Sequence, residues 1–398
     1  MRLVCKSCAV FMCFVTFISW GGFVDGFAMA DCLVTSVNLT PLNDLTNGQY
    51  QGFSGGLYPN QSNIRPEIHE QAGLEIARNI RPLNAQGNAD AGGSIGLISV
   101  GMSNTNQEFG HLLPLVEEAS NVRPQMVLVN AAQGGQSADK IVNNGTQYWA
   151  GVDHKLSDAG LTAQQVQVVW LKQADGRPSL EFPANAQQLQ DELKILSQTM
   201  KDRFPNLAII YFSSRIYGGY SRNELRNEPV SYQTGFAVKW VIEAQINGDP
   251  ELNYDPANGP VRAPWLSWGP YLWADGLNPR SDGLTWACDE LREDDGHHPS
   301  DLGRDKVAAM LLDFFQTDAT AQPWFLNNPI AYLACSDDVT VAGVFDNNKN
   351  TFIDDAEVLN AVRRWASGRP LPETGEALSD QQVKHIVDLW IQAKPIDV

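Results

Sequence analysis

From residue 94 onward, short continuous apolar runs alternate with longer stretches whose apolar positions recur every three or four residues. Apolar runs bounded by glycine or polar residues are typical of strands buried on both faces of a parallel sheet. The runs cover residues 95–100, 126–130, 166–171 and 207–212, and the helical patterns cover residues 109–120, 186–204, 236–246 and 302–315. This alternation predicts an α/β fold, a three-layer α/β/α sandwich with a parallel, flavodoxin-like sheet.

The composition changes along the chain and predicts four parts. Residues 1–30 form a leader, and residues 31–93, rich in Asn, Gly, Gln and Pro, form an N-terminal extension packed on the main domain. The main domain covers residues 94–325. Residues 336–398 form a small C-terminal helical module.

The leader is typical of a secretory signal peptide. Arg2 and Lys6 precede an apolar segment, and Ala28 and Ala30 form an Ala-x-Ala cleavage site. Glycines interrupt the segment, which is short for a membrane span, and no later run is apolar enough to cross a bilayer. We therefore expect cleavage after Ala30 and a secreted protein, extracellular or periplasmic, without a membrane span in its mature form.

The net charge limits the kinds of binding partner to expect, and the cysteine content bears on disulfide formation outside the cytoplasm. The chain has 43% hydrophobic residues and a formal net charge of -18, which disfavours nucleic acid and anionic membranes as partners. Cleavage leaves Cys32, Cys288 and Cys335, two of which can pair in an oxidising compartment. Their spacing does not choose the pair, although a bond between Cys288 and Cys335 would tie the loop near residue 293 to the segment leaving the main domain.

A serine stands where the first apolar run breaks, in Gly101-Met102-Ser103-Asn104. The carboxyl ends of strands in an open α/β sheet border the crevice in which ligands bind, so the hydroxyl of Ser103 would face that crevice. The alternative is an ordinary polar loop in which the serine caps the next helix.

The segment of residues 293–300 places two histidines beside carboxylates. An Asp three residues before a His can bind one ring nitrogen and leave the other free to take a proton from a serine. Two such pairs overlap, Asp294 with His297 and Asp295 with His298. We favour the second, because His298 precedes a proline and is pushed towards an extended backbone. His297 is then expected to point to another side, towards solvent or the rim of the pocket.

Together these segments resemble the SGNH (GDSL-like) hydrolase family, which has its nucleophile first and an Asp-x-x-His-Pro pattern last. The resemblance covers roughly residues 94–315 and implies that Ser103, Asp295 and His298 are catalytic. Residues 130–137 resemble the family's second block, which implies that Gly135 donates a backbone N–H to the oxyanion.

The chain departs from the family pattern in two places. Met102 and Asn104 flank the serine, where the family usually has Asp before it and Ser or Asn after it. In the third block, residues 168–175, Gln173 replaces the oxyanion-donating Asn, and its amide can still donate. The family's carbohydrate and sialate O-acetylesterase branches have a Trp-x-Gln version of this block, which Trp170 and Gln173 resemble with one residue inserted.

A substrate pocket is expected beside these residues. Arg215 and Tyr217 follow a predicted strand at the same sheet edge and are candidates for a pocket wall, although Arg215 is equally explained by pairing with a surface acid. The loop of residues 221–281 is rich in aromatic residues. Those that could stack on sugar rings, or simply pack, are Trp265, Trp268, Tyr271 and Trp273.

The C-terminal module contains a pattern that matches a calcium loop. The expected ligands are the side chains of Asp346, Asn348, Asn350, Asp354 and Glu357 and the carbonyl of Phe352. Thr351 stands where Gly is expected, which should weaken affinity. The module resembles EF-hand and dockerin-like modules with one loop, and the alternative is an Asx-rich turn without metal.

Two functions of different classes follow. The first is a secreted serine esterase of SGNH type that removes acetyl or other small acyl groups from extracellular carbohydrate, with no metal or other cofactor in the chemistry. The second is a carbohydrate-binding or cell-surface adhesion protein that keeps the fold without turnover and uses the calcium module as an anchor.

Overall fold

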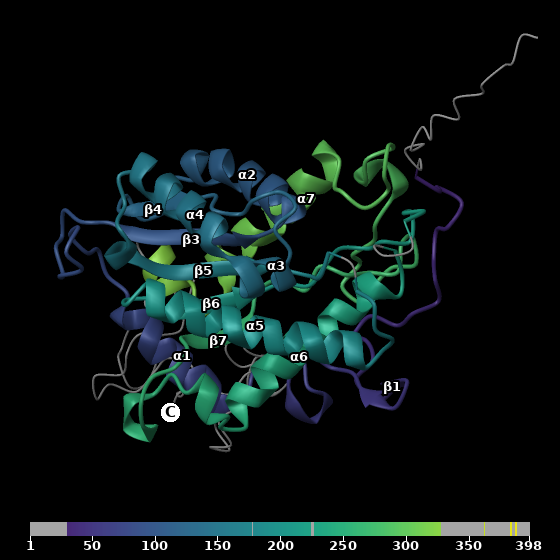
Figure 1. The fold of residues 1–398 in the computed structure, drawn as a ribbon, viewed down its shortest axis with the longest axis horizontal. Coiled ribbons are helices and arrows are strands. Elements are labelled where there is room, and N and C mark those ends of the chain that lie inside the picture. Colours follow the sequence, from purple (N-terminus) through teal and green to yellow (C-terminus); the bar gives the residue numbers. More distant parts are fainter. Residues whose placement is uncertain are drawn as a thin grey trace, which may run out of the picture. The chain divides into compact units, whose positions relative to one another are not determined.

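Five parallel strands form the central sheet of the computed structural model, which describes residues 30–176, 178–223 and 227–327 and the single residues 362, 383 and 387 (Figure 1). Every residue of β3 (Ile95–Gly101) and β5 (Val166–Lys172) is buried. The other strands are β4 (Met126–Val129), β6 (Ile209–Phe212) and β7 (Trp265–Trp268). The order is β4-β3-β5-β6-β7, which confirms the predicted parallel α/β sheet.

Helices flank this sheet in two groups. The helices are α1 (Glu67–Asn79), α2 (Ser103–Glu118), α3 (Ala138–Asn144), α4 (Thr146–Asp158), α5 (Ala184–Arg203), α6 (Val230–Ile246), α7 (Asp301–Thr317) and α8 (Gln322–Phe325). Contacts join α2 to α7, α7 to α8 and α8 to α1, and separately join α3 to α4 and α5, and α5 to α6. Right-handed crossovers place α2 on one face and the helices that follow β4, β5 and β6 on the other, because the chain reverses its direction along the sheet after β4. Among the described residues, no helix is long and apolar enough to cross a membrane.

The switch in strand order after β4 predicts where a ligand would bind. The chain moves from β3 to β4 on one side and then to β5 on the other, so the carboxyl ends of β3 and β5 flank the point where the strand order switches. Crevices in open α/β sheets lie at such switch points. Ser103 follows β3 and Gln173 follows β5, so both stand at this edge.

Residues 30–93 contact the elements that follow β6. They include a short hairpin, β1 (Gln49–Tyr50) with β2 (Phe53–Ser54). Ser36 Oγ donates to Asp275, the hydroxyl of Tyr58 lies 3.0 Å from Ser267 Oγ, and Cys32 forms a disulfide with Cys288. The disulfide therefore excludes a bond between Cys288 and Cys335. The internal contacts of the chain divide it after Phe325.

Four aromatic residues of the 221–281 segment are buried. Trp265 and Trp268 belong to the edge strand β7, which the sequence pattern did not predict, and they are 0% and 3% exposed. Tyr271 and Trp273 are buried as well. Of the two alternatives left open by the sequence, their burial therefore favours packing over stacking on sugar rings.

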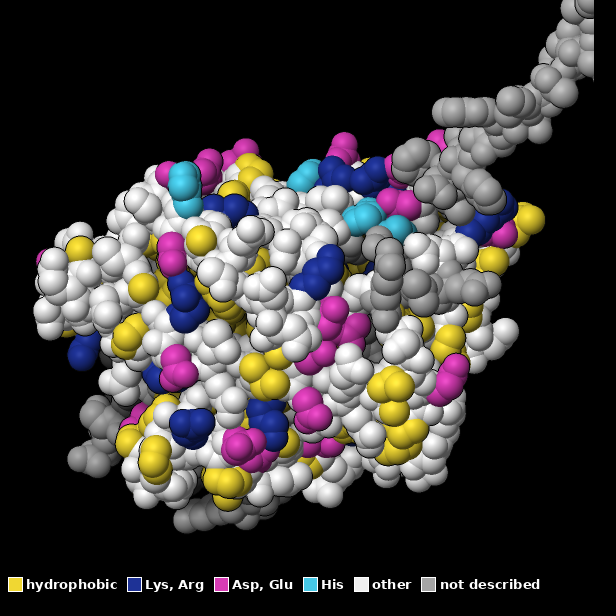
Figure 2. Space-filling model, in the orientation of Figure 1, with side chains coloured by type: hydrophobic (Ala, Val, Ile, Leu, Met, Phe, Trp, Pro, Cys, Tyr) yellow, Lys and Arg dark blue, Asp and Glu magenta, His cyan; other side chains and the backbone are white. Residues whose placement is uncertain are grey.

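The surface of the described residues carries both charge types. Figure 2 shows acidic and basic side chains interspersed over the visible face. Residues 1–29 of the leader and the calcium loop of residues 346–357 lie outside the described residues.

Candidate active site

Ser103 lies at the junction between β3 and α2. The strand ends at Gly101, Met102 has an extended backbone (φ -91°, ψ -158°), and the helix begins at Ser103. Gly101 is required here, because a Cβ would collide with the side chain of Thr105 and the carbonyl of Lys172. The serine therefore stands in the first turn of α2, where unpaired backbone N–H groups and the helix dipole favour negative charge.

A tight turn presents the acid and the base. Gly296 has a φ of +65°, and a Cβ there would collide with the carbonyl of Tyr220. The backbone N–H of Arg292 donates to the carbonyl of His298 over 2.8 Å and closes the turn. The prediction that glycine lets the chain fold back at this point agrees with this geometry.

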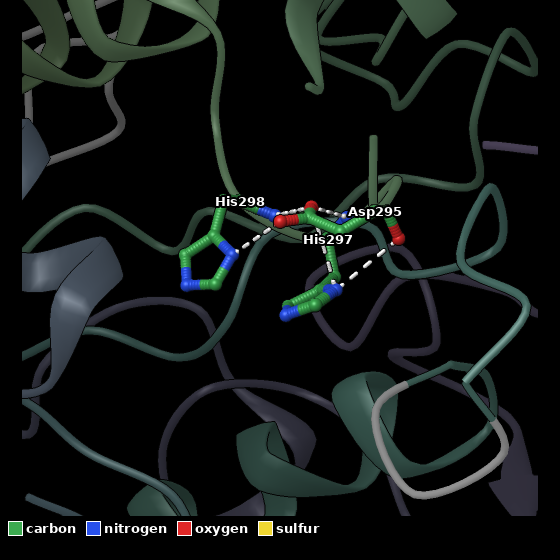
Figure 3. Close-up of side chains that lie close together, drawn as sticks. All are labelled: Asp295, His297 and His298. Atoms are coloured by element: carbon green, nitrogen blue, oxygen red, sulfur yellow. Dashed lines mark hydrogen bonds and ion pairs between the residues drawn. The ribbon is translucent and has the colours of Figure 1, made fainter. Parts of the chain in front are cut away.

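Three side chains are connected by hydrogen bonds in the order that nucleophilic catalysis requires. Ser103 Oγ lies 2.7 Å from His298 Nε2, and His298 Nδ1 lies 2.7 Å from Asp295 Oδ2. Figure 3 shows the second contact, with the imidazole of His298 extending from the turn beside the carboxylate. The structure thus joins Asp295 to His298, whereas Asp294 contacts Arg292.

The Asp295 carboxylate stays ionised. Burial would raise its pKa, but the ring of His298 and the backbone N–H groups of His298 and His297 donate to it and hold the pKa well below its usual value. These N–H groups lie 2.9 and 3.0 Å from Asp295 Oδ1. An ionised carboxylate fixes the proton on Nδ1 of His298, which leaves Nε2 to accept the proton of Ser103.

His297 does not point to solvent, which was one of the two positions expected for it. It is 6% exposed, and its ring centroid lies 4.3 Å from that of His298. Burial, followed by the charge of His298, lowers its pKa to about 4, so the ring is neutral near pH 7. The sequence left both positions open, because the elements that cover the turn come from distant parts of the chain.

A metal ion is not needed to explain this cluster. Donor atoms of Asp295, His297 and His298 lie within 4.8 Å of one another, and they are the one such group among the described residues. The direct hydrogen bond between Asp295 and His298, and that between His298 and Ser103, account for the proximity.

Asn104 is a site residue whose role the sequence did not reveal. Its Nδ2 donates to the carbonyl of His297 over 2.9 Å, and the residue is 9% exposed. The residue after the serine therefore holds the turn that carries the base. An amide at this position was the available signal, but its partner lies far away in the sequence.

The two residues expected to join Ser103 in donating to the oxyanion, Gly135 and Gln173, have different surroundings. Gly135 has a φ of +73° and is exposed, while a Cβ on its neighbour Gly134 would lie 4.0 Å from Ser103 Cβ. Gln173 is 2% exposed, and its Nε2 donates to the carbonyl of Gln136 over 2.8 Å. Its amide thus braces the glycine loop through one of its two N–H bonds, and its contact with the oxyanion stays a prediction.

The two predicted pocket residues are both buried. Tyr217 is 0% exposed and its hydroxyl donates to the carbonyl of Val34 over 2.9 Å, so it anchors the N-terminal segment and is no pocket wall. Arg215 is 6% exposed, so neither a solvent-facing wall nor a surface ion pair describes it. Its charge contributes to the low pKa of His297.

Comparisons with known proteins gave matches to solved structures. No family model matches the chain, and no curated protein matches it. A carbohydrate esterase family 3 structure from Talaromyces cellulolyticus is 15% identical, with 55% of this chain and 94% of that chain covered and a TM-score of 0.30. A structure described as a GDSL-like lipase, from Parabacteroides merdae, is 11% identical, with 61% and 98% covered and a TM-score of 0.31.

A third match is the periplasmic domain of a lipopolysaccharide acetyltransferase from Salmonella ser. Paratyphi A. It is 11% identical, 62% of this chain and 96% of that chain are covered, and the TM-score is 0.33. At these TM-scores the likenesses carry no inference about chemistry, which has to come from the side chains at the sheet edge.

Proposed function

We propose that this protein is a serine hydrolase of SGNH type that cleaves carboxylic esters through an acyl-enzyme. The observation that supports the proposal most strongly is the unbroken chain of hydrogen bonds from Ser103 through His298 to Asp295. A serine that merely capped a helix would gain nothing from a histidine held by an ionised carboxylate. The same chain favours turnover over the alternative of a binding or adhesion protein without activity.

The residue roles follow from the geometry. Ser103 Oγ attacks the ester carbonyl carbon and transfers its proton to His298 Nε2, and Asp295 stabilises the imidazolium. The proton then passes to the departing alcohol as the carbon–oxygen bond of the ester breaks and the acyl-enzyme remains. Water, deprotonated by His298, then attacks the carbonyl carbon of the acyl group and forms a second tetrahedral intermediate. This intermediate breaks its bond to Ser103 Oγ, which releases the acid, and His298 returns the proton to Ser103.

The tetrahedral oxyanion is stabilised by backbone N–H groups in this scheme. The N–H of Ser103 stands at the first turn of α2, and Gly134 brings the glycine loop beside the serine. Gln173 holds that loop through Gln136. Preorganised N–H donors of this kind commonly contribute about 10²- to 10³-fold each to turnover.

The substrate is proposed to be an acylated carbohydrate outside the cell, with acetyl as the acyl group. The disulfide between Cys32 and Cys288 supports export, because such bonds persist in oxidising compartments. The signal-peptide pattern ending at Ala30 agrees with this. Trp170 and Gln173, which resemble the family's Trp-x-Gln version with one residue inserted, are the sequence feature that favours carbohydrate O-acetyl esters.

Calcium is proposed as a structural ion of the C-terminal module. The carboxylates and amides from Asp346 to Glu357 form the pattern of a calcium loop. Millimolar Ca²⁺ should then raise the melting temperature, because an ion that binds the folded state alone stabilises it by mass action. The variant Asp346→Ala/Glu357→Ala should lose the shift, and a wild type that does not respond to chelator would refute the site.

The test of the function is a panel of p-nitrophenyl esters of increasing acyl length together with acetylated sugars. The wild type should hydrolyse short-chain esters, and Ser103→Ala should lose that activity while keeping its circular dichroism spectrum. Ser120→Ala changes an exposed serine at the far end of α2 and serves as the matched control. Equal rates for Ser103→Ala and the wild type would refute the proposal.

A further inference from the structure

A buried ion pair lies close to Ser103 and has no role in the chemistry described above. The ammonium of Lys172 lies 2.5 and 2.6 Å from the two carboxylate oxygens of Glu108. The side chain of Lys172 is 2% exposed and that of Glu108 is 0% exposed. Glu108 lies on α2, beyond the turn that begins with the nucleophile, and Lys172 is the last residue of β5.

Lys172 holds α2 through both its side chain and its main chain. While the ammonium binds Glu108, the carbonyl accepts a hydrogen bond from Thr105 Oγ1 over 2.7 Å. Gly101 allows this close approach, since a Cβ would occupy the same space. The start of α2 is thus fixed to the carboxyl end of β5 at two points, and the position of Ser103 is fixed with it.

The charge of Glu108 also reaches the base. Burial raises the pKa of Glu108, and the positive charges of Lys172, Arg215 and His298 oppose that rise. Burial lowers the pKa of Lys172, Glu108 opposes this, and Arg215 adds to it. Coulomb attraction acts equally on both partners, so the Glu108 carboxylate attracts the proton that His298 takes from the serine. Asp295 and His297 also lie beside His298, and the charge of Arg215 acts on both Glu108 and His297.

Stability alone does not explain a buried pair at this place. Replacing a buried ion pair by apolar residues of similar volume is often neutral or stabilising, whereas removing one partner is costly. We propose that Glu108 and Lys172 are positioning residues of the proposed hydrolase. The pair fixes the first turn of α2 so that Ser103 Oγ meets His298 Nε2, and Glu108 joins Asp295 in stabilising the protonated base.

The inference rests on the proposed function, so its test measures activation of the serine directly. The rate of covalent labelling of Ser103 by a serine-directed phosphonate is followed against pH for the wild type and for Glu108→Leu/Lys172→Met. The control is Lys239→Met/Glu243→Leu, which removes another ion pair, 3.1 Å apart on α6, away from the site. Glu108→Gln is included because it keeps the size of the side chain and a hydrogen-bonding partner for Lys172.

The double variant should remain folded, with a melting temperature near that of the wild type, and should be labelled about a hundredfold more slowly. The acidic limb of the rate profile should move to lower pH in Glu108→Gln, because this variant removes a negative charge and leaves the ammonium of Lys172. The double variant removes one charge of each sign and should show a smaller displacement. The control pair should change the melting temperature alone.

Labelling of a folded double variant at the wild-type rate and with the same pH profile would overturn the inference. If the double variant does not fold, an unchanged pH profile for Glu108→Gln would overturn it. A wild type whose Ser103 is not labelled would instead refute the proposed function, and the inference with it.

Discussion

Asn104 Nδ2 donates to the carbonyl oxygen of His297 over 2.9 Å, so the residue next to the nucleophile is bonded to the residue next to the base. The contact is buried and joins the start of α2 to the turn that carries Asp295 and His298. Because serine and histidine must stay within hydrogen-bond distance, this contact limits how far the two segments can move apart.

The first prediction concerns this contact. Asn104→Ala removes the donor and leaves the His297 carbonyl without it, so we expect turnover of the best ester to fall about a hundredfold, with a loss of stability of about 1–3 kcal/mol. Asn79→Ala, which changes an exposed asparagine on α1, should leave both quantities unchanged. Steady-state kinetics with urea unfolding provide the measurement, and unaltered turnover in Asn104→Ala would show that the contact does not position the base.

The second prediction separates the two histidines. His298→Ala should reduce turnover by about 10⁴-fold or more, and Asp295→Asn should be comparably damaging, because the base and its orienting carboxylate are lost. His297→Ala should act mainly on stability, since it removes a buried ring that packs on His298. Asp294→Asn should be mild. Greater sensitivity of His297 and Asp294 would mean that the catalytic pair is the other one.

The third prediction is a loss of stability in mild acid. Burial lowers the pKa of both His69 and His297 to about 4, from 6.5. The unfolded chain takes up these protons as the pH falls below 6.5 while the folded protein does not, so stability is fully present above that pH and is lost progressively down to about pH 4. Each group accounts for up to about 3 kcal/mol of this change.

The Asp295 carboxylate acts further down the pH scale. Because its pKa is held below the ordinary 3.8, the stability that it contributes is lost as the pH falls below that value. Urea unfolding at pH 7.5 and pH 4.5 measures the contribution of the histidines. In His69→Gln, the free energy of unfolding should fall less between these two pH values, by the contribution of one histidine. An equal fall in wild type and variant would contradict the role given to His69.

The sequence predicted the strands and turns that are determined by residues close together in the chain, and it missed several elements without a clear local pattern. Strands β3 and β5 were predictable because they are continuous apolar runs, and the Asp295 to His298 turn because its residues are neighbours in the chain. Strand β7 was missed, since Trp-Leu-Ser-Trp lies between proline-rich and glycine-rich segments and includes the polar Ser267. Helices α3 and α4 were missed as well, because the Asn and Gly residues of their segment hide the periodicity.

The site residues that escaped prediction all depend on contacts between distant segments. Nothing near Lys172 indicates that a lysine ending an apolar strand turns inward to Glu108, and nothing near His297 indicates burial. Tyr217 appeared to be a pocket residue because its strand ends at the correct edge, but the N-terminal segment covers it through Val34. Such contacts are set by packing, which local patterns do not specify.

The fourth prediction concerns the Cys32–Cys288 disulfide. It links the N-terminal segment to the short helical turn Cys288–Glu290, which precedes the catalytic turn, across a sequence separation of 256. Removing a bond that closes so long a loop should cost about 2–5 kcal/mol. Cys32→Ser/Cys288→Ser, or reductant applied to the wild type, should lower the melting temperature, whereas Cys335→Ser retains both partners and should not. A melting temperature that is the same with and without reductant would contradict this role.

The central claim is that Ser103 is a nucleophile activated by His298. The most direct measurement is intact mass spectrometry with peptide mapping after treatment with a serine-directed phosphonate. The account predicts one adduct per chain, located on Ser103, loss of ester hydrolysis in proportion to labelling, and labelling that is strongly slowed in His298→Ala. Hydrolysis that continues after complete labelling of Ser103, or an active enzyme in which Ser103 remains unmodified while another residue carries the adduct, would contradict it.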